Sequence, residues 1–210
     1  MTGYHNANNW ETDYSQRGRI WAGAVHQPLP LIAGKRVLEL GCGNGKTCNA
    51  LLEKKCHVVG IDFSSSAVNL CRSHAPKNTD GHFAVADICH LPFPVASFDA
   101  VIAFHVIGHL FAEGRSSCAH EVARVLRPGG ILYFSDFSKE DFRAGAGTEI
   151  EPGTFSRKNG IATHYFSEDE VTALLYELTP GESQTRRWTM KVRGQSLPRA
   201  EISASFTKNV

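Results

Sequence analysis

Residues 36–47, Arg-Val-Leu-Glu-Leu-Gly-Cys-Gly-Asn-Gly-Lys-Thr, pass from an apolar run into three glycines at alternate positions. Val37, Leu38 and Leu40 are typical of a buried strand in a parallel sheet, and the apolar residues after Gly45 recur at helical spacing. Glycine tolerates positive φ and lets a ligand approach bare backbone. The first amide groups of the following helix favour acceptor or anionic atoms. The stretch therefore predicts an α/β fold with a nucleotide-type pocket at the turn.

Three ligand classes use a strand, a glycine turn and a helix, and the glycine spacing separates them. The dinucleotide pattern Gly-x-Gly-x-x-Gly requires glycine where this chain has Lys46. The phosphate-binding loop Gly-x-x-x-x-Gly-Lys-Ser/Thr matches at Gly45 to Thr47, but its first glycine falls on Leu40. The remaining pattern, Glu-x-Gly-x-Gly-x-Gly over residues 39–45, resembles motif I of the class I S-adenosylmethionine-dependent methyltransferases.

A second predicted strand, residues 57–62, ends in Asp62, which lies 21 residues after Gly41. A carboxylate at that distance in a βαβ unit lies beside the glycine turn and accepts hydrogen bonds from ribose hydroxyls. The structural alternative is a surface aspartate at a strand end. The acid favours an adenosine ligand, because phosphate-loop proteins have no comparable need for it.

The resemblance continues through the next two strands. A third strand begins at Gly81 and exits at Asp87; in the family this acid accepts from the adenine amino group, and the next amide, here that of Ile88, donates to a ring nitrogen. The segment Val-Leu-Arg-Pro-Gly-Gly-Ile-Leu, residues 125–132, is similar to the approach to the fifth strand in the type 11 group. The resemblance thus covers residues 36 to about 137.

The resemblance implies a doubly wound, seven-stranded, mostly parallel sheet with a reversed last strand. The alternating runs 185–192 and 200–206 are interpreted as a hairpin that closes this sheet. S-adenosyl-L-methionine is the implied cofactor, and S-adenosyl-L-homocysteine its product. The expected cofactor-binding residues are Glu39, Gly41, Cys42, Gly43, Gly45, Asp62, Phe63, Asp87, Ile88, Phe104 and Trp21.

Candidate catalytic residues are three histidines. His105 follows the fourth predicted strand, residues 98–104, and ligands lie beyond the carboxyl ends of parallel strands. His109 would share a helix face with it, and His164 follows a glycine-rich segment. Zinc is rejected, because no His-Glu-x-x-His pattern accompanies these residues. The alternative for each histidine is a wall of the pocket or packing.

Substrate contacts are expected from two segments. Residues 1–34 are interpreted as a helical, aromatic lid that contributes Tyr14, and residues 35–210 as the methyltransferase domain. Within that domain, residues 139–163 lose every periodic pattern, and a loop of that length is typically a functional lid or disordered. We therefore expect a substrate lid over 139–166 that contributes Tyr165, with packing as the alternative role of both tyrosines.

Composition narrows the functional class. The 210 residues carry a formal net charge of +1 and are 42% hydrophobic, as in an ordinary soluble protein of one domain. The six cysteines form no Cys-x-x-Cys pair and are expected to be reduced core thiols in a cytoplasmic protein. No apolar run reaches ~18 residues, so neither a signal peptide nor a membrane span is expected.

The predicted function is methyl transfer from S-adenosylmethionine to an N, O or S atom of a small molecule. A methyltransferase for tRNA or protein is the alternative: residues 184–210 contain six Lys or Arg and one Glu. Charges on edge strands also prevent aggregation, and this reading is favoured over RNA binding. A nucleotide-binding protein without methyl transfer is the third reading. The sequence indicates no oligomeric state and no acceptor atom.

Overall fold

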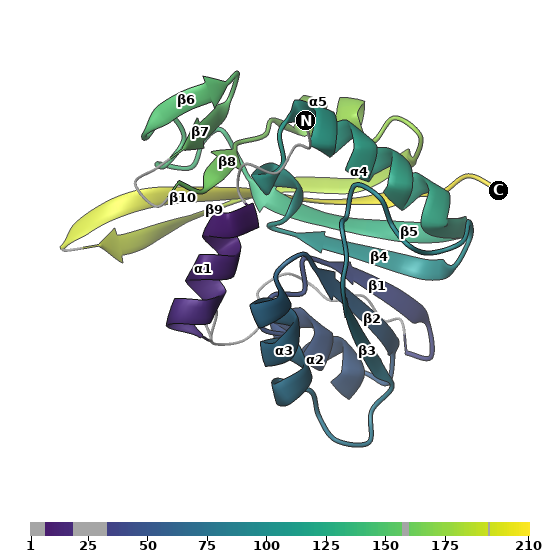
Figure 1. Cartoon of the computed structure of the whole chain (residues 1–210). Helices are drawn as coiled ribbons and strands as arrows, with labels where there is room; N and C mark the ends of the chain where they lie inside the picture. The colour runs from purple at the N-terminus through teal and green to yellow at the C-terminus, as the bar shows by residue number, and fades with distance from the viewer. Residues whose placement is uncertain (1–6, 19–32, 157–159, 193) are drawn as a thin grey trace.

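The computed structural model describes residues 7–18, 33–156, 160–192 and 194–210. Its centre is a seven-stranded sheet with the order β3-β2-β1-β4-β5-β10-β9 (Figure 1). The strands are β1 (Arg36–Leu40), β2 (His57–Asp62), β3 (Gly81–Val85), β4 (Phe98–Phe104), β5 (Leu126–Phe137), β9 (Thr179–Val192) and β10 (Gln195–Thr207). Strands β1 to β5 pair in parallel, and β10 is antiparallel to both β5 and β9. The predicted sheet with a reversed last strand is confirmed.

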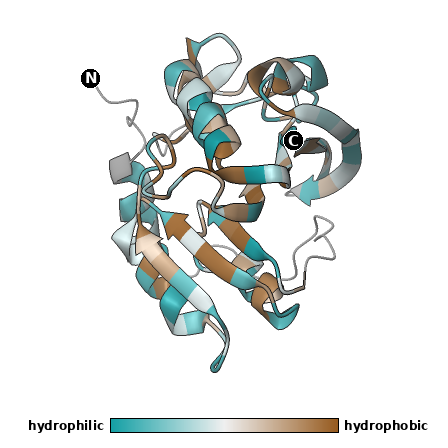
Figure 2. Cartoon of the chain, turned by 90° about the vertical axis from the view of Figure 1, so that its right-hand side faces the viewer, coloured by the Kyte–Doolittle hydropathy of each residue, from teal (hydrophilic) through white to brown (hydrophobic). Residues whose placement is uncertain are grey.

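Helices cover both faces of this sheet. On one face α2 (Lys46–Glu53) and α3 (Ser65–His74) pack on a core that includes Val37 and Ile102. On the other, α4 (Ala112–Val125) and α5 (Glu168–Leu174) pack on a larger core that includes Leu38 and Val101. Adjacent strand residues enter opposite cores because side chains alternate across a strand. Hydrophobic residues form much of the strands in Figure 2, with hydrophilic residues interspersed.

Two further pieces lie beyond the carboxyl edge of the parallel strands. Helix α1 (Ala7–Arg17) lies next to α3. A small antiparallel sheet of β6 (Thr148–Glu151), β7 (Thr154–Ser156) and β8 (Ala162–His164) occupies most of the segment expected to be a loop. The expectation of a long patternless loop was wrong: the strands have only three or four residues, too few for alternation to appear, and Gly153 makes the β6–β7 turn with φ 75°.

Serine side chains cap two of the helices. Ser64 caps α3 by accepting from the amide of Ala67, and Ser167 caps α5 by accepting from that of Glu170. All six cysteines are buried and free of disulfides. Strand β5 begins at Leu126, before the Pro-Gly-Gly segment that was interpreted as the approach to it. Among the described residues, no helix has the length and apolar character needed to cross a membrane.

Candidate functional site

At the glycine turn after β1, residues from two other elements come close to the backbone. Gly41 and Gly43 have φ values of 65° and 52°. A Cβ on Gly41 would lie 2.6 Å from Cγ2 of Val106, and one on Gly43 would lie 2.5 Å from the hydroxyl oxygen of Tyr14. Both positions therefore require glycine for conformation and for space. The turn is bounded by the segment after β4 and by α1, which brings Tyr14 to the predicted cofactor site.

Asp62 joins the end of β2 to this turn. Its Oδ2 accepts from the amide of Gly43 at 3.0 Å, and its Oδ1 accepts from the amide of Ser64 at 2.9 Å. The side chain is buried at 5% exposure. Burial raises the pKa of Asp62 to about 6, although the two amides oppose the shift. The carboxylate thus lies beside the turn, and each oxygen keeps lone pairs for a further donor.

Glu39 is the second buried acid at the turn. It is 5% exposed, and its Oε2 has no hydrogen-bond partner among the described residues. Burial raises the pKa of this carboxyl to about 8, so without a bound cation the group is largely protonated at pH 7. An orphaned buried acceptor is uncommon in a folded protein and indicates a place where a donor or a cation binds.

The other expected cofactor residues lie around the turn in different environments. Asp87 is tied to its own loop: Oδ1 accepts from the amide of Cys89 at 2.6 Å, and Oδ2 lies 3.0 Å from Nδ1 of His90. Ile88 and Cys42 are buried, whereas Phe104 and Phe63 are partly buried. Gly45 has φ 84° at the start of α2 and packs against Cys71. Trp21 lies outside the described residues.

Helix α1 is attached to both sides of the turn. The carboxylate of Glu11 accepts from the hydroxyls of Ser64 and Ser66, each at 2.6 Å, at the start of α3. These hydroxyl donors lower the pKa of Glu11. Asn9 donates to the carbonyl of Gly160, beside the small sheet, at 2.9 Å. Helix α1 therefore links the cofactor side of the site to the segment expected to cover the substrate.

His105 stands at the carboxyl end of β4 in an unusual backbone conformation, with φ 53°. Its Nε2 lies 3.5 Å from Oε2 of Glu201, and its Nδ1 lies 3.9 Å from Oδ1 of Asp136. Its ring centroid is 4.5 Å from that of Phe137. The expectation that His105 shares a helix face with His109 was wrong, because the chain turns sharply here and only residues 107–109 form a short 3-10 helix, η1 (Ile107–His109).

The remaining predicted residues are more enclosed. His109 Nδ1 lies 2.8 Å from the carbonyl oxygen of Ala162, and burial lowers its pKa. His164 is buried at 1% exposure, between the hydroxyl of Thr154 and the carboxylate of Glu170, each 2.7 Å away. Tyr165 is also 1% exposed and packs near Phe137 and Phe155. These contacts favour the packing alternative for His164 and Tyr165.

Comparison with known proteins was made once this geometry was established. Residues 38–134 match the family described as a methyltransferase domain. The crystal structure of an S-adenosylmethionine-dependent methyltransferase from Methanosarcina mazei superposes with a TM-score of 0.73 at 25% identity, covering 88% of this chain and 99% of that one. The chain belongs to the class I S-adenosylmethionine-dependent methyltransferases. Its strand order and glycine turn are those that the resemblance implied.

Two relatives indicate the range of this methyltransferase family. A 27-O-demethylrifamycin SV methyltransferase of Amycolatopsis mediterranei is 38% identical over 158 residues, 71% of this chain and 55% of that protein. A tRNA N(3)-cytidine methyltransferase of Gallus gallus is 30% identical over 154 residues, 68% of this chain and 42% of that protein. The chain spans about half the length of the curated relatives it matches.

The site fits the cofactor of this methyltransferase family. Its methionyl ammonium would complement the orphaned oxygen of Glu39, and its ribose hydroxyls would donate to Asp62. When bound, S-adenosylmethionine supplies an electrophilic methyl group on a sulfonium. Three acids that accompany this site were not predicted: Glu11, Asp136 and Glu201. Asp136 carried a usable signal, because it also lies near the carboxyl end of a predicted strand.

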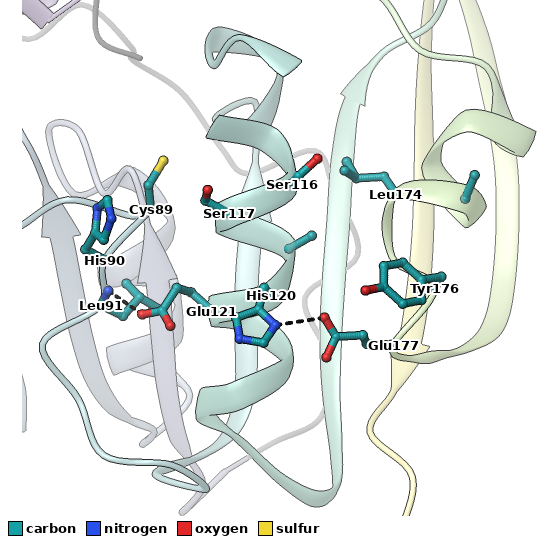
Figure 3. A pocket seen from close by; sticks show the side chains of 12 residues that line it. Cys89, His90, Leu91, Ser116, Ser117, His120, Glu121, Leu174, Tyr176 and Glu177 are labelled. Carbon is teal, nitrogen blue, oxygen red and sulfur yellow. Dashed lines mark hydrogen bonds and ion pairs between the residues drawn. The ribbon is translucent and has the colours of Figure 1, made fainter. Parts of the chain in front are cut away.

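A groove on the outer surface of the methyltransferase is separate from this site. It lies between α4 and the turn after α5 and measures about 720 Å³ (Figure 3). His120 and Glu177 form an ion pair across it at 3.0 Å, and Glu121 accepts from the amide of Leu91. Its lining includes neither the glycine turn nor His105. The groove reaches the loop after β3 at Cys89, His90 and Leu91.

Proposed function

We propose that the protein is an S-adenosylmethionine-dependent methyltransferase that transfers a methyl group to an N, O or S atom of a small molecule. The observation that carries the proposal is the orphaned buried carboxyl of Glu39 beside the glycine turn. A dehydrogenase or phosphate-loop protein has no use for a cation-binding acid at that place. Gly41, Gly43 and Asp62 supply the rest of the cofactor contacts.

The enclosure of the acceptor side favours a small molecule. Helix α1 and the small sheet of β6, β7 and β8 lie beyond the carboxyl edge of the parallel strands, where β8 contacts η1, and we assign both as covers of the substrate site. Holding the acceptor in line with the methyl group and excluding water supply much of the rate enhancement in such a transfer. An acceptor the size of a folded RNA would need these covers to be open.

Transfer to tRNA is the second candidate, because one relative is a tRNA methyltransferase and the last hairpin is rich in arginine. The described arginines of that hairpin are engaged within the protein. Arg186 pairs with Glu201, Arg187 with Glu140, and Arg199 with the buried Asp141. Neutralised guanidinium groups contribute less to phosphate binding, so the hairpin favours a small acceptor over RNA.

Calorimetry with S-adenosylhomocysteine tests the cofactor site. We expect wild-type protein to bind it and Asp62→Ala to bind at least about tenfold more weakly, the loss of roughly one charged hydrogen bond. Asp80→Ala is the matched control, because Asp80 is an exposed acid that pairs with His57 and His82. Tight binding of NAD or ATP with no binding of S-adenosylhomocysteine would refute the proposal. A steep salt dependence of tRNA affinity, lost on substitution of the hairpin arginines, would instead favour the RNA acceptor.

A further inference from the structure

Two arginines share one buried aspartate just beyond the carboxyl end of β5. Oδ1 of Asp141 accepts from Nε of Arg143 at 2.7 Å, and Oδ2 accepts from Nε of Arg199 at 2.6 Å. Nη2 of Arg143 and the amides of Arg143 and Ala200 also donate to this carboxylate. A carboxylate has about four lone-pair sites, so Asp141 is saturated. Two positive charges thus face one negative charge, and one positive charge remains.

Each guanidinium group keeps a nitrogen that the protein does not use. The side chains of Arg143 and Arg199 are only 15% and 11% exposed. Among the described residues, Nη1 of Arg143 and Nη2 of Arg199 have no hydrogen-bond partner, and Nη1 of Arg199 has only the weakly accepting sulfur of Met190, at 3.6 Å. The fully buried atoms that lack a partner lie elsewhere. Both nitrogens are therefore open to a ligand.

Both guanidinium groups lie against Phe137, the last residue of β5. The Cζ atoms of Arg143 and Arg199 are 3.8 Å and 5.3 Å from its ring centroid. The same ring packs on His105, with 4.5 Å between the centroids, and the next residue, Val106, borders the glycine turn. A ligand of these arginines therefore lies next to the carboxyl ends of β4 and β5, where the methyl acceptor is expected.

We propose that Arg143 and Arg199 bind a carboxylate of the methyl acceptor, so that the protein methylates a small carboxylic acid at another of its atoms. This deepens the proposed function and rests on it. Guanidinium groups recognise carboxylates through paired N–H donors of fixed geometry. The one positive charge that Asp141 leaves matches one carboxylate. A phosphate monoester carries about two negative charges at pH 7, and RNA carries one on each phosphate, so both fit this charge less well.

Acetate tests the site, because no part of this probe besides its carboxylate has to fit. Protein saturated with S-adenosylhomocysteine is titrated with acetate at constant ionic strength, and the Nε–H signals of the arginines are followed by NMR. The signals of Arg143 and Arg199 should shift together and reach saturation with one Kd. Acetamide, an uncharged analogue of similar size, should leave them in place. Shifts that do not saturate, or that acetamide reproduces, would overturn the proposal.

Substitutions of Arg143 test its part in binding. Arg143→Gln should weaken acetate binding at least about tenfold, followed on the Arg199 signal, because a charged hydrogen bond is lost. Arg143→Lys keeps a cation beside Asp141 and so guards against misfolding, but its single nitrogen does not reproduce the guanidinium fork, and it should also bind acetate more weakly. The control is Arg187→Gln, which removes an exposed guanidinium paired with Glu140 and should bind acetate as the wild type does. Wild-type affinity in both Arg143 variants would contradict the assignment.

Two further ligands separate this proposal from its neighbours. If inorganic phosphate shifts the same signals and binds more tightly than acetate, the anchor of the acceptor is a phosphate, and the carboxylate assignment is wrong. If the wild type fails to bind S-adenosylhomocysteine, the proposed function fails. If it binds S-adenosylhomocysteine but not acetate, only the carboxylate site fails, since the cofactor's own carboxylate is already in place.

Discussion

The carboxyl groups of Glu39 and Asp62 at the glycine turn are buried and therefore shielded from water. Glu39 carries the clearest consequence. Its pKa is raised to about 8 by burial, and one of its oxygens has no partner among the described residues. A bound ammonium would favour the ionised form of this carboxyl. Cofactor binding should therefore release a proton from Glu39 at neutral pH.

This linkage gives a pH dependence with a defined sign. Because the carboxyl must ionise to pair with the cation, affinity for S-adenosylhomocysteine should rise with pH between about 6 and 8 and level off above that range. Calorimetry in two buffers of different ionisation enthalpy should report close to one proton released per cofactor bound near pH 7. Glu39→Gln should abolish the release attributable to this group, and Glu53→Gln, at an exposed position at the end of α2, should not. Equal release by wild type and Glu39→Gln would contradict this role.

At the scale of the element, α1 is held by polar contacts more than by a large apolar face. Of the side chains described in it, only Tyr14 is fully buried, and its attachment to α3 runs through Glu11 and the serines at the start of that helix. Helices with few buried apolar contacts open at low free energy. We therefore expect α1 to open at a lower free energy than the central sheet.

Loss of the Glu11 contact should be visible as local opening. Glu11→Gln removes charged hydrogen bonds to Ser64 and Ser66, each of the kind worth about 1.5 kcal/mol or more. We expect amide hydrogen exchange in α1 to accelerate by about tenfold, with β1 and β4 unchanged. Asp13→Asn is the control, since Asp13 pairs with Arg17 of the same helix. Exchange in α1 that is equal in wild type and Glu11→Gln would show that other contacts hold the helix.

At the scale of the whole molecule, one buried acid joins the segment after β5 to the last hairpin. The side chain of Asp141 is fully buried and pairs with Nε of Arg143 at 2.7 Å and Nε of Arg199 at 2.6 Å. Burial opposes ionisation, but the two guanidinium groups hold the pKa of Asp141 below its usual range. Arg143 also stacks on Phe137, 3.8 Å from the ring centroid, so the ion pairs reach the ring that packs on His105.

Removal of this charge should destabilise the protein globally. Asp141→Asn leaves two partly buried guanidinium groups without their carboxylate, and we expect the free energy of unfolding in urea to fall by about 3 kcal/mol. The control is Asp80→Asn, which removes an exposed acid paired with His57 and His82 and should change the free energy of unfolding much less. Since the pKa of Asp141 is depressed, its contribution should be present near neutrality and be lost as pH falls below about 4. Equal stability of the two variants would exclude the proposed role.

Local signals in the sequence determined the strands of the parallel sheet, the glycine turn and the acids at the ends of β2 and β3. These features are encoded in periodicity, in glycine conformation and in spacing within one βαβ unit, so Glu39, Gly43 and Asp62 were predicted together. The three-stranded sheet was missed because its strands are too short to establish a period. His164 and Tyr165 were selected for their chemistry, which says nothing about burial.

Only the tertiary structure decided which distant residues meet. Glu11 reaches Ser64 over 53 positions, and His105 meets acids from β5 and β10, because the order of strands in the sheet, and not their order in the chain, sets which carboxyl ends are neighbours. A periodic or spacing pattern in the sequence depends only on whether the residues of that segment can turn or be buried. The energy of a contact between elements exists only once both are folded, so it leaves no period or spacing in either segment alone.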